Sequence, residues 1–162
     1  MSVNPRFYKG SSLPEKEKVV AAGSVTWKAG QPGRSTDSGW TPCVSNASQI
    51  NGVFAVTQPT ATTAGDKVWV HRITSADQMF VMNVTSAGTD TKAGSAVVGS
   101  NYGYAVNSSV GTISIGNDST EILHVYDLLA NKEGIMNDTS DVPAKLIVGV
   151  VASALTAEGT GM

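Results

Sequence analysis

The sequence predicts an all-β fold, a small β-sandwich or β-barrel with an extended N-terminal arm and little helix. Short runs rich in β-branched and aromatic residues recur at roughly 8–12-residue spacing, separated by clusters of turn residues. Charged residues make up only 15% of the 162 residues, which is too few for a coiled coil, and 41% are hydrophobic, which is too apolar for a disordered chain. One segment alone, residues 121–129, also fits helical spacing.

Residues 1–18 are expected to form the arm. Two prolines and the turn material between them interrupt regular structure in this segment. The mixed-charge run at its end, residues 15–18, is typical of a solvated face. The alternative is an arm that becomes ordered on a partner, with Phe7 and Tyr8 as its anchors.

Residues 19–156 are expected to form a single β domain, and residues 157–162 a frayed C-terminal tail. A long polar loop is expected at 29–39, and no repeat of 20–50 residues is visible. The expected strands cover residues 19–20, 24–28, 52–57, 67–73, 79–84, 96–98, 102–106, 111–115, 121–129 and 145–152.

The segment 67–73 illustrates the pattern that predicts these strands. Alternate side chains of a strand point to opposite sides of the sheet. Val68 and Val70 are therefore expected on one face, and Trp69 and His71 on the other.

The charge balance and the single cysteine exclude further classes. With 11 basic and 13 acidic residues the net charge is −2, which argues against a nucleic-acid partner. No apolar run approaches the ~20 residues of a membrane span, so no membrane partner is expected. Cys43 has no second cysteine to pair with and the chain begins without a signal-peptide pattern, so we expect synthesis in a reducing cytoplasm.

No residue pattern indicates catalysis. His71 and His124 have no further ligand at metal-binding spacing, and no Gly-x-Ser-x-Gly motif is present. Cys43 has no neighbouring base and is expected to be a small buried residue. We therefore predict no catalytic residue, no metal ligand and no cofactor, and the chain is not expected to be an enzyme. A small β-barrel enzyme remains the third alternative.

Aromatic residues have two possible uses here. They can fill a core or a subunit interface, or they can form a platform that stacks on sugars. The residues weighed in this way are Trp27, Trp40, Trp69, Tyr102 and Tyr104. The predicted partner-binding residues are Arg6, Phe7, Tyr8, Lys9, Trp27 and Trp40.

Two segments carry a family resemblance. The first runs through Gly52-Val53-Phe54-Ala55-Val56-Thr57, a Thr/Ala spacer and Ala64-Gly65-Asp66-Lys67-Val68-Trp69-Val70, ending at Arg72. The second is the closing run from Pro143 to Val151. Together they cover about a fifth of the chain. With the small, charge-poor β profile, the sequence resembles the head decoration (capsid cement) proteins of tailed bacteriophages.

The resemblance implies a structural virion protein. Such a protein would bind the outer surface of an assembled capsid, with the major capsid protein as its partner, and would clamp neighbouring capsid subunits. It would be a homo-oligomer, with a trimer favoured, located on the outside of the virion. We expect the arm, residues 1–18, to add to a sheet edge on the capsid, where main-chain hydrogen bonds give affinity. The alternative is a carbohydrate- or receptor-binding β-sandwich module of a phage fibre or similar appendage.

Overall fold

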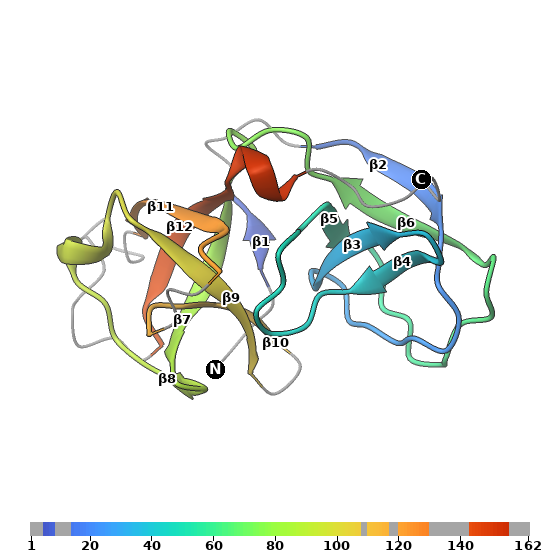
Figure 1. Cartoon of the computed structure of the whole chain (residues 1–162), viewed down its shortest axis with the longest axis horizontal. Coiled ribbons are helices and arrows are strands. Elements are labelled where there is room, and N and C mark those ends of the chain that lie inside the picture. The colour runs from blue at the N-terminus through green and yellow to red at the C-terminus, as the bar shows by residue number, and fades with distance from the viewer. Residues whose placement is uncertain (1–4, 9–13, 108–109, 117–119, 130–142, 156–162) are drawn as a thin grey trace.

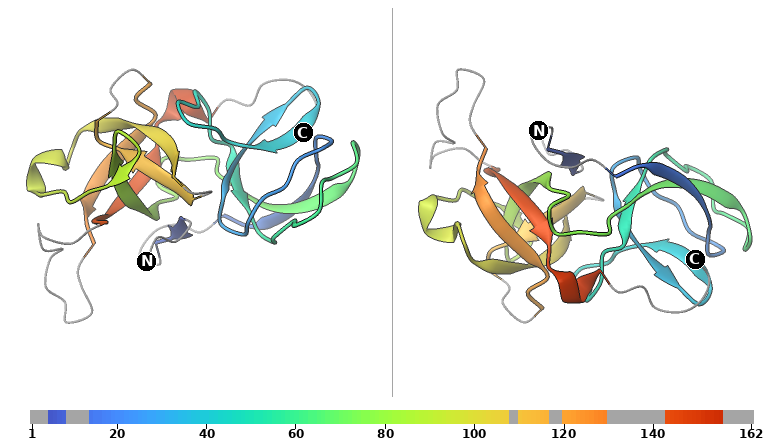
Figure 2. Two further views of the ribbon diagram at one scale, coloured as in Figure 1. Left: turned by 90° about the horizontal axis from the view of Figure 1, so that it is seen from below. Right: turned by 90° about the horizontal axis from the view of Figure 1, so that it is seen from above.

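The structure is a computed structural model, and it describes residues 5–8, 14–107, 110–116, 120–129 and 143–155. Within these segments the chain forms twelve β-strands, two short 3₁₀ helices and no α-helix. The all-β fold and the small helix content predicted from the sequence are therefore confirmed. The strands form two sheets that lie side by side (Figures 1 and 2).

The N-terminal sheet contains five strands in the order β2-β6-β5-β3-β4, each antiparallel to its neighbour. Its strands are β2 (Lys16–Val20), β3 (Pro32–Thr36), β4 (Gly39–Pro42), β5 (Gly52–Phe54) and β6 (Lys67–Arg72). The two ends of the sheet meet at a parallel bridge between Ala21 and Trp40. There the amide of Ala22 donates to the carbonyl oxygen of Trp40 over 2.9 Å. The sheet is thus curled into a ring, which we call the N-terminal barrel.

The C-terminal sheet closes more fully. Its ring consists of β7 (Phe80–Ser86), β9 (Asn101–Asn107), β10 (Val110–Ser114), β11 (Leu123–Leu128) and β12 (Lys145–Val150). Because β7 pairs with β10 and also with β12, the order β7-β10-β9-β11-β12 returns to β7. We call this ring the C-terminal barrel. Two short strands, β1 (Arg6–Phe7) and β8 (Thr89–Asp90), add to β7.

The two barrels share one strand order. In each ring the first strand lies between the third and the fifth, and the second lies between the third and the fourth. The first and third strands are parallel in both rings, and every other pair is antiparallel. The chain therefore repeats a topology that its residue pattern does not reveal.

Each barrel has its own buried cluster. The N-terminal cluster is aromatic and consists of Val19, Ala21, Trp27, Trp40, Phe54, Val68 and Val70. The C-terminal cluster is larger and mostly aliphatic, with Phe80, Met82, Ile113, Leu123 and Leu146 among its most buried side chains. Apolar burial of this kind is the main favourable term in folding.

The connection between β4 and β5 joins the two barrels. It belongs in sequence to the N-terminal barrel, yet Cys43, Ala47 and Ile50 are buried in the C-terminal cluster. The amide of Ile50 donates to the carbonyl oxygen of Ala154 in η2 (Ala152–Ala154) over 3.0 Å. The barrels therefore share a core rather than meeting only at their surfaces.

Three local predictions are wrong. Residues 24–28 form no strand and contribute a single bridge, between Trp27 and Gln58. The polar loop predicted at 29–39 contains β3 and the start of β4, because burial and the Gly39 turn outweigh low strand propensity. Residues 96–98 overlap the 3₁₀ helix η1 (Ser95–Val97). The other expected strands overlap observed ones, and β11 fills most of 121–129.

The predicted arm pairs with its own chain at two places. Arg6 and Phe7 lie opposite Val81 and Phe80 in β1 and β7. Residues 16–18 lie in β2, inside the N-terminal barrel. The end of the predicted arm is thus part of the body, while the division into one domain with a tail at 157–162 stays a prediction, since the tail lies outside the described residues.

Candidate interaction surface

An exposed tryptophan lies beside two lysines on the outer face of β2 and β6. Lys18 lies opposite Trp69 in the register of the two strands, and Lys16 lies opposite His71, so these side chains share one face. The Nζ atoms of Lys16 and Lys18 lie 5.4 and 5.3 Å from the centroid of the Trp69 ring. Both distances are within cation–π range. We call Lys16, Lys18 and Trp69 the Lys–Trp face.

The strand alternation separates the charges of β2. Glu17 points to the opposite side of the strand and forms an ion pair with Arg72, with Oε1 and Nη2 2.7 Å apart. Lys67, at the start of β6, has the same strand parity as Trp69 and is exposed. The outer face of β2 and β6 therefore carries three ammonium groups, and the Glu17 carboxylate is held by Arg72 on the other side.

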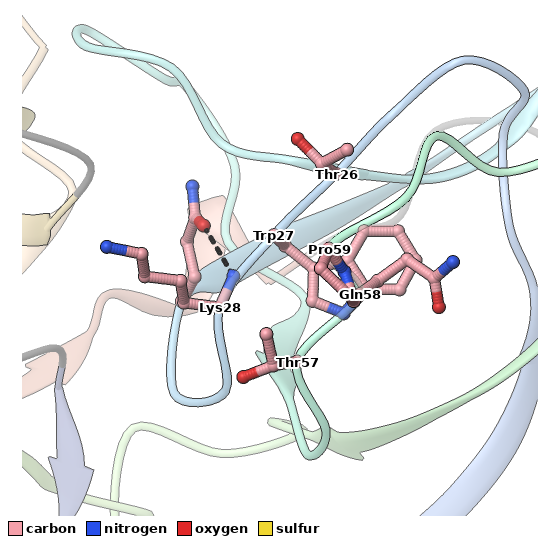
Figure 3. A pocket seen from close by; sticks show the side chains of 7 residues that line it. Thr26, Trp27, Lys28, Thr57, Gln58 and Pro59 are labelled. Carbon is pink, nitrogen blue, oxygen red and sulfur yellow. Dashed lines mark hydrogen bonds between the residues drawn. The ribbon is translucent and has the colours of Figure 1, made fainter.

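Two shallow hollows lie beside this face. A cavity of about 130 Å³ is lined by Trp27, Val56, Thr57, Gln58, Lys67, Val68 and Trp69. A second hollow of about 300 Å³ is lined by Thr26, Trp27, Lys28, Gln31, Thr57, Gln58 and Pro59 (Figure 3). The Trp27 indole forms a floor shared by both, since its N–H donates to the Val56 carbonyl oxygen over 2.7 Å and its ring stacks on Phe54 at 4.0 Å. Both hollows therefore place the polar side chains of Thr57 and Gln58 beside a Trp27 ring that is held by a hydrogen bond and by stacking.

A further apolar groove follows β1. It measures about 350 Å³ and is lined by Arg6, Phe7, Tyr8, Val81 and Leu129. The Phe7 ring packs edge-on against His71 of the N-terminal barrel at 5.5 Å and against Phe80 of the C-terminal barrel at 6.4 Å. Phe7 therefore joins the two barrels as well as lining the groove.

The predicted partner-binding residues do not form one surface. Trp40 is 0% exposed and Trp27 is 4% exposed. Both side chains are buried in the N-terminal cluster, so the prediction that they lie on a partner-facing surface is wrong. Arg6 is exposed at the rim of the β1 groove. Phe7 and Tyr8 are half-buried there, and Lys9 lies outside the described residues.

Cys43 is buried, as predicted, and its environment suppresses ionisation. Burial raises the pKa of its thiol from 9.0 to about 12, against a smaller lowering effect of the Arg34 charge. The pKa of Tyr104 is also raised well above its usual value, chiefly by burial and further by Cys43. Both groups stay neutral near pH 7, which is a structural role rather than that of an activated nucleophile.

The two histidines have separate surroundings. Nδ1 of His124 lies 2.6 Å from Oδ1 of Asn101, and its ring packs edge-on against Tyr126 at 4.8 Å. His71 lies on the face of β6 against Phe7. Among the residues that the structure describes, no three His, Cys, Asp or Glu side chains gather as a metal site would require.

Sequence reasoning missed the Lys–Trp face. The run 15–18 was interpreted as a solvated charged segment, and Trp69 as one of several aromatic residues. The available signal was the alternation of Lys and Glu, which places the lysines on one side if the run is a strand. Their position beside Trp69 depends on the pairing of β2 with β6, which the sequence does not specify.

Comparison of the chain with protein-family models, with curated proteins and with solved structures finds no match. In the described parts of the chain, no helix has the length and apolar character needed to cross a membrane.

Proposed function

We propose that this chain is a structural binding protein of a phage virion, which attaches to the outer surface of an assembled capsid and clamps neighbouring major capsid subunits. The observation that carries this proposal is a jointly packed body with an exposed aromatic and basic surface. Cys43, Ala47 and Ile50 lock the two barrels together, and Trp69 stays 40% exposed on the outside. Exposed aromatic surface on a rigid scaffold is characteristic of protein contacts.

Two further considerations support the proposal. The resemblance of residues 52–72 and 143–151 to capsid decoration proteins lies in segments that include β5, β6 and β12. These strands form the walls of both barrels, so the resemblance concerns the scaffold. A clamp needs such a scaffold because a body that deforms easily would lose binding free energy on ordering.

Parts of the predicted arm pair with strands of the chain itself. Since Arg6 and Phe7 pair with β7 and residues 16–18 pair with β6, deleting residues 2–18 would remove strands from the body. We therefore assign the capsid contact to outer surfaces of the barrels. The favoured homotrimer remains part of the proposal, and sedimentation equilibrium of the purified chain measures it directly.

Binding to purified capsids tests the proposal. The full-length chain is mixed with capsids that lack it, and the pellet after sedimentation is quantified over a range of chain concentrations. We expect saturable binding and a higher temperature of capsid disruption. Absence of binding at chain concentrations well above the concentration of capsid sites would contradict the proposed function.

The hollow in Figure 3 favours a second candidate, a carbohydrate-binding module. Its lining offers hydroxyl and amide groups from Thr57 and Gln58 beside the Trp27 ring. Against this, the nearby Trp69 ring has two ammonium groups close to it, which a sugar would have to displace to stack there. Titration with a panel of neutral and acidic glycans by calorimetry decides the matter, with Gln58→Ala as the variant expected to lose any true glycan binding.

A further inference from the structure

In the part of the chain that the structure describes, the first residues of strand β2 have no strand partner on the edge that faces away from β6, although the ring closes onto β4 just beyond the end of the strand. Among the described residues, Lys16–Val20 pairs with β6 alone, and pairing with β4 begins at the bridge between Ala21 and Trp40, beyond its end. The amide of Ala21 donates to the backbone carbonyl oxygen of Asp66, the residue before β6, so the backbone groups of Ala21 point toward β6. Because backbone groups point to alternate sides along a strand, those of Lys16 and Lys18 point away from β6. The Lys–Trp face thus borders a row of available backbone donors and acceptors.

We propose that an extended acidic segment of a partner protein adds to this edge as a further strand, with carboxylates at alternate positions facing Lys16 and Lys18. Such strand addition takes its affinity from main-chain hydrogen bonds and its selectivity from alternate side chains. The inference rests on the proposed function, because it names the chemistry of the capsid segment that this protein would bind.

The charge pattern selects an acidic strand. Residues directly opposite Lys16 and Lys18 on an added strand would lie on the same face, where opposite charges stabilise the pair and like charges destabilise it. The Trp69 ring lies within cation–π distance of both ammonium groups, on the face that the carboxylates of an added strand would share. Glu17 does not oppose an acidic partner, since it is paired with Arg72 on the other side of the strand.

The same pattern disfavours a second copy of β2 as the occupant. Antiparallel pairing of two β2 strands would place lysine opposite lysine on one face, and in the register centred on Glu17 it would also place glutamate opposite glutamate on the other. The charges of the chain are nevertheless unevenly distributed between its two halves. Residues 1–76 hold eight basic and four acidic residues, and residues 77–162 hold three and nine. Contact with the acidic half of another copy is therefore an outcome that the test must separate.

Backbone protection distinguishes strand addition from general attraction to anions. A nucleic acid or a sulfated sugar would neutralise the lysines without pairing with the strand edge. The probe is a synthetic eight-residue peptide with glutamate and threonine in alternation, and the control peptide has the same composition with the four glutamates contiguous. We expect the alternating peptide to slow hydrogen exchange at the Lys16 and Lys18 amides more than the control peptide does.

Charge reversal tests the side-chain part of the proposal. The variant Lys16→Glu/Lys18→Glu is compared with Lys92→Glu/Lys145→Glu, which changes the net charge equally at two lysines outside the Lys–Trp face and the hollows beside it. We expect the first variant to bind the alternating peptide about tenfold more weakly or worse, and the second to stay within about twofold of the unchanged chain. Circular dichroism and urea denaturation establish that both variants are folded.

Three results would overturn the inference. These are equal binding by the two variants, unprotected amides at Lys16 and Lys18 in the bound state, and self-association of the unchanged chain that the first variant abolishes. Equal binding or unprotected amides would mean that the lysines serve only to prevent edge-to-edge aggregation.

Capsid binding separates this inference from the proposed function. If both variants bind purified capsids as tightly as the unchanged chain, the function stands and the acidic-strand inference fails. If the unchanged chain ignores capsids yet protects its Lys16 and Lys18 amides with the alternating peptide, the function fails and the inference stands.

Discussion

The two barrels have the same strand order, but their rings close in different ways. The C-terminal ring closes through three paired positions between β7 and β10, and the buried hydroxyls of Thr85 and Thr112 lie 3.0 Å apart at this seam. The N-terminal ring closes through the single bridge between Ala21 and Trp40. A ladder of hydrogen bonds holds the first seam, and a single bridge beside a buried tryptophan holds the second.

The buried clusters of the two barrels also differ in size and in residue type. The N-terminal cluster has seven buried residues, of which Trp27, Trp40 and Phe54 are aromatic, whereas the C-terminal cluster has twenty. Three of those twenty, Cys43, Ala47 and Ile50, come from the β4–β5 connection. A small core thus depends on a few large side chains, and a large core can incorporate a neighbour's loop.

The strongest test of the N-terminal barrel is Trp40→Ala. The side chain is fully buried, packs edge-on against Phe54 at 6.5 Å and has the Arg72 guanidinium 5.4 Å from its ring. We expect a loss of about 3–5 kcal/mol in the free energy of unfolding, measured by urea denaturation. Trp40→Phe is the control, because it keeps an aromatic ring and removes an indole N–H that is buried without a partner. A loss below about 1 kcal/mol for Trp40→Ala would mean that this barrel does not depend on its aromatic core.

The shared core is tested by Ile50→Ala. Ile50 is 0% exposed in the C-terminal cluster although it precedes β5 of the N-terminal barrel. We expect a loss of roughly 2–5 kcal/mol in one cooperative transition, followed by both tryptophan fluorescence and circular dichroism. Val70→Ala, in the N-terminal cluster, should shift that same transition. Two separate transitions, of which each variant moves only one, would show that the barrels unfold independently.

Sequence patterns predicted the fold class but not the repeat within it. Alternation such as that of Val68 and Val70 reports which side chains share a face of the strand, and the structure shows that this face is the buried one. It does not report which strands are neighbours. The hairpin β3–β4 was missed because residues such as Gly33 and Ser35 have low strand propensity, although both are buried.

The site was predictable only in part. Phe7 and Tyr8 were identified as anchors, and the structure places them in a groove of their own chain. Trp27 and Trp40 were assigned to a partner surface because composition does not distinguish a buried tryptophan from an exposed one. Trp69 faces solvent because its strand neighbours Val68 and Val70 fill the barrel interior.

A smaller effect is expected at the seam of the N-terminal barrel, with Gly39→Ala. Gly39 has a φ of +110°, and an added Cβ would lie 2.7 Å from the backbone carbon of Ala21. We expect a loss of about 1–3 kcal/mol, together with faster hydrogen exchange at the Ala22 amide, which donates across the seam. Gly65→Ala is the matched control, since Gly65 has a φ of +95° with no atom within 4 Å of an added Cβ. Equal losses in the two variants would attribute the whole effect to backbone strain.

The junction between the barrels should also make the protein sensitive to alkali. The pKa of Cys43 is raised to about 12 when folded, because burial disfavours the thiolate, so the folded state keeps a proton that the unfolded chain releases near pH 9. The stabilisation is complete below that pH and is lost as the pH rises toward 12, with a slope of about 1.4 kcal/mol per pH unit. Tyr104, whose pKa is raised in the same direction, adds to the slope above pH ~10. Urea denaturation between pH 8 and pH 10 measures the effect, and Cys43→Ala should remove the part between about pH 9 and pH 10. An unchanged slope in that variant would mean that the thiol meets water in the native state, and hence that the β4–β5 connection does not seal the shared core.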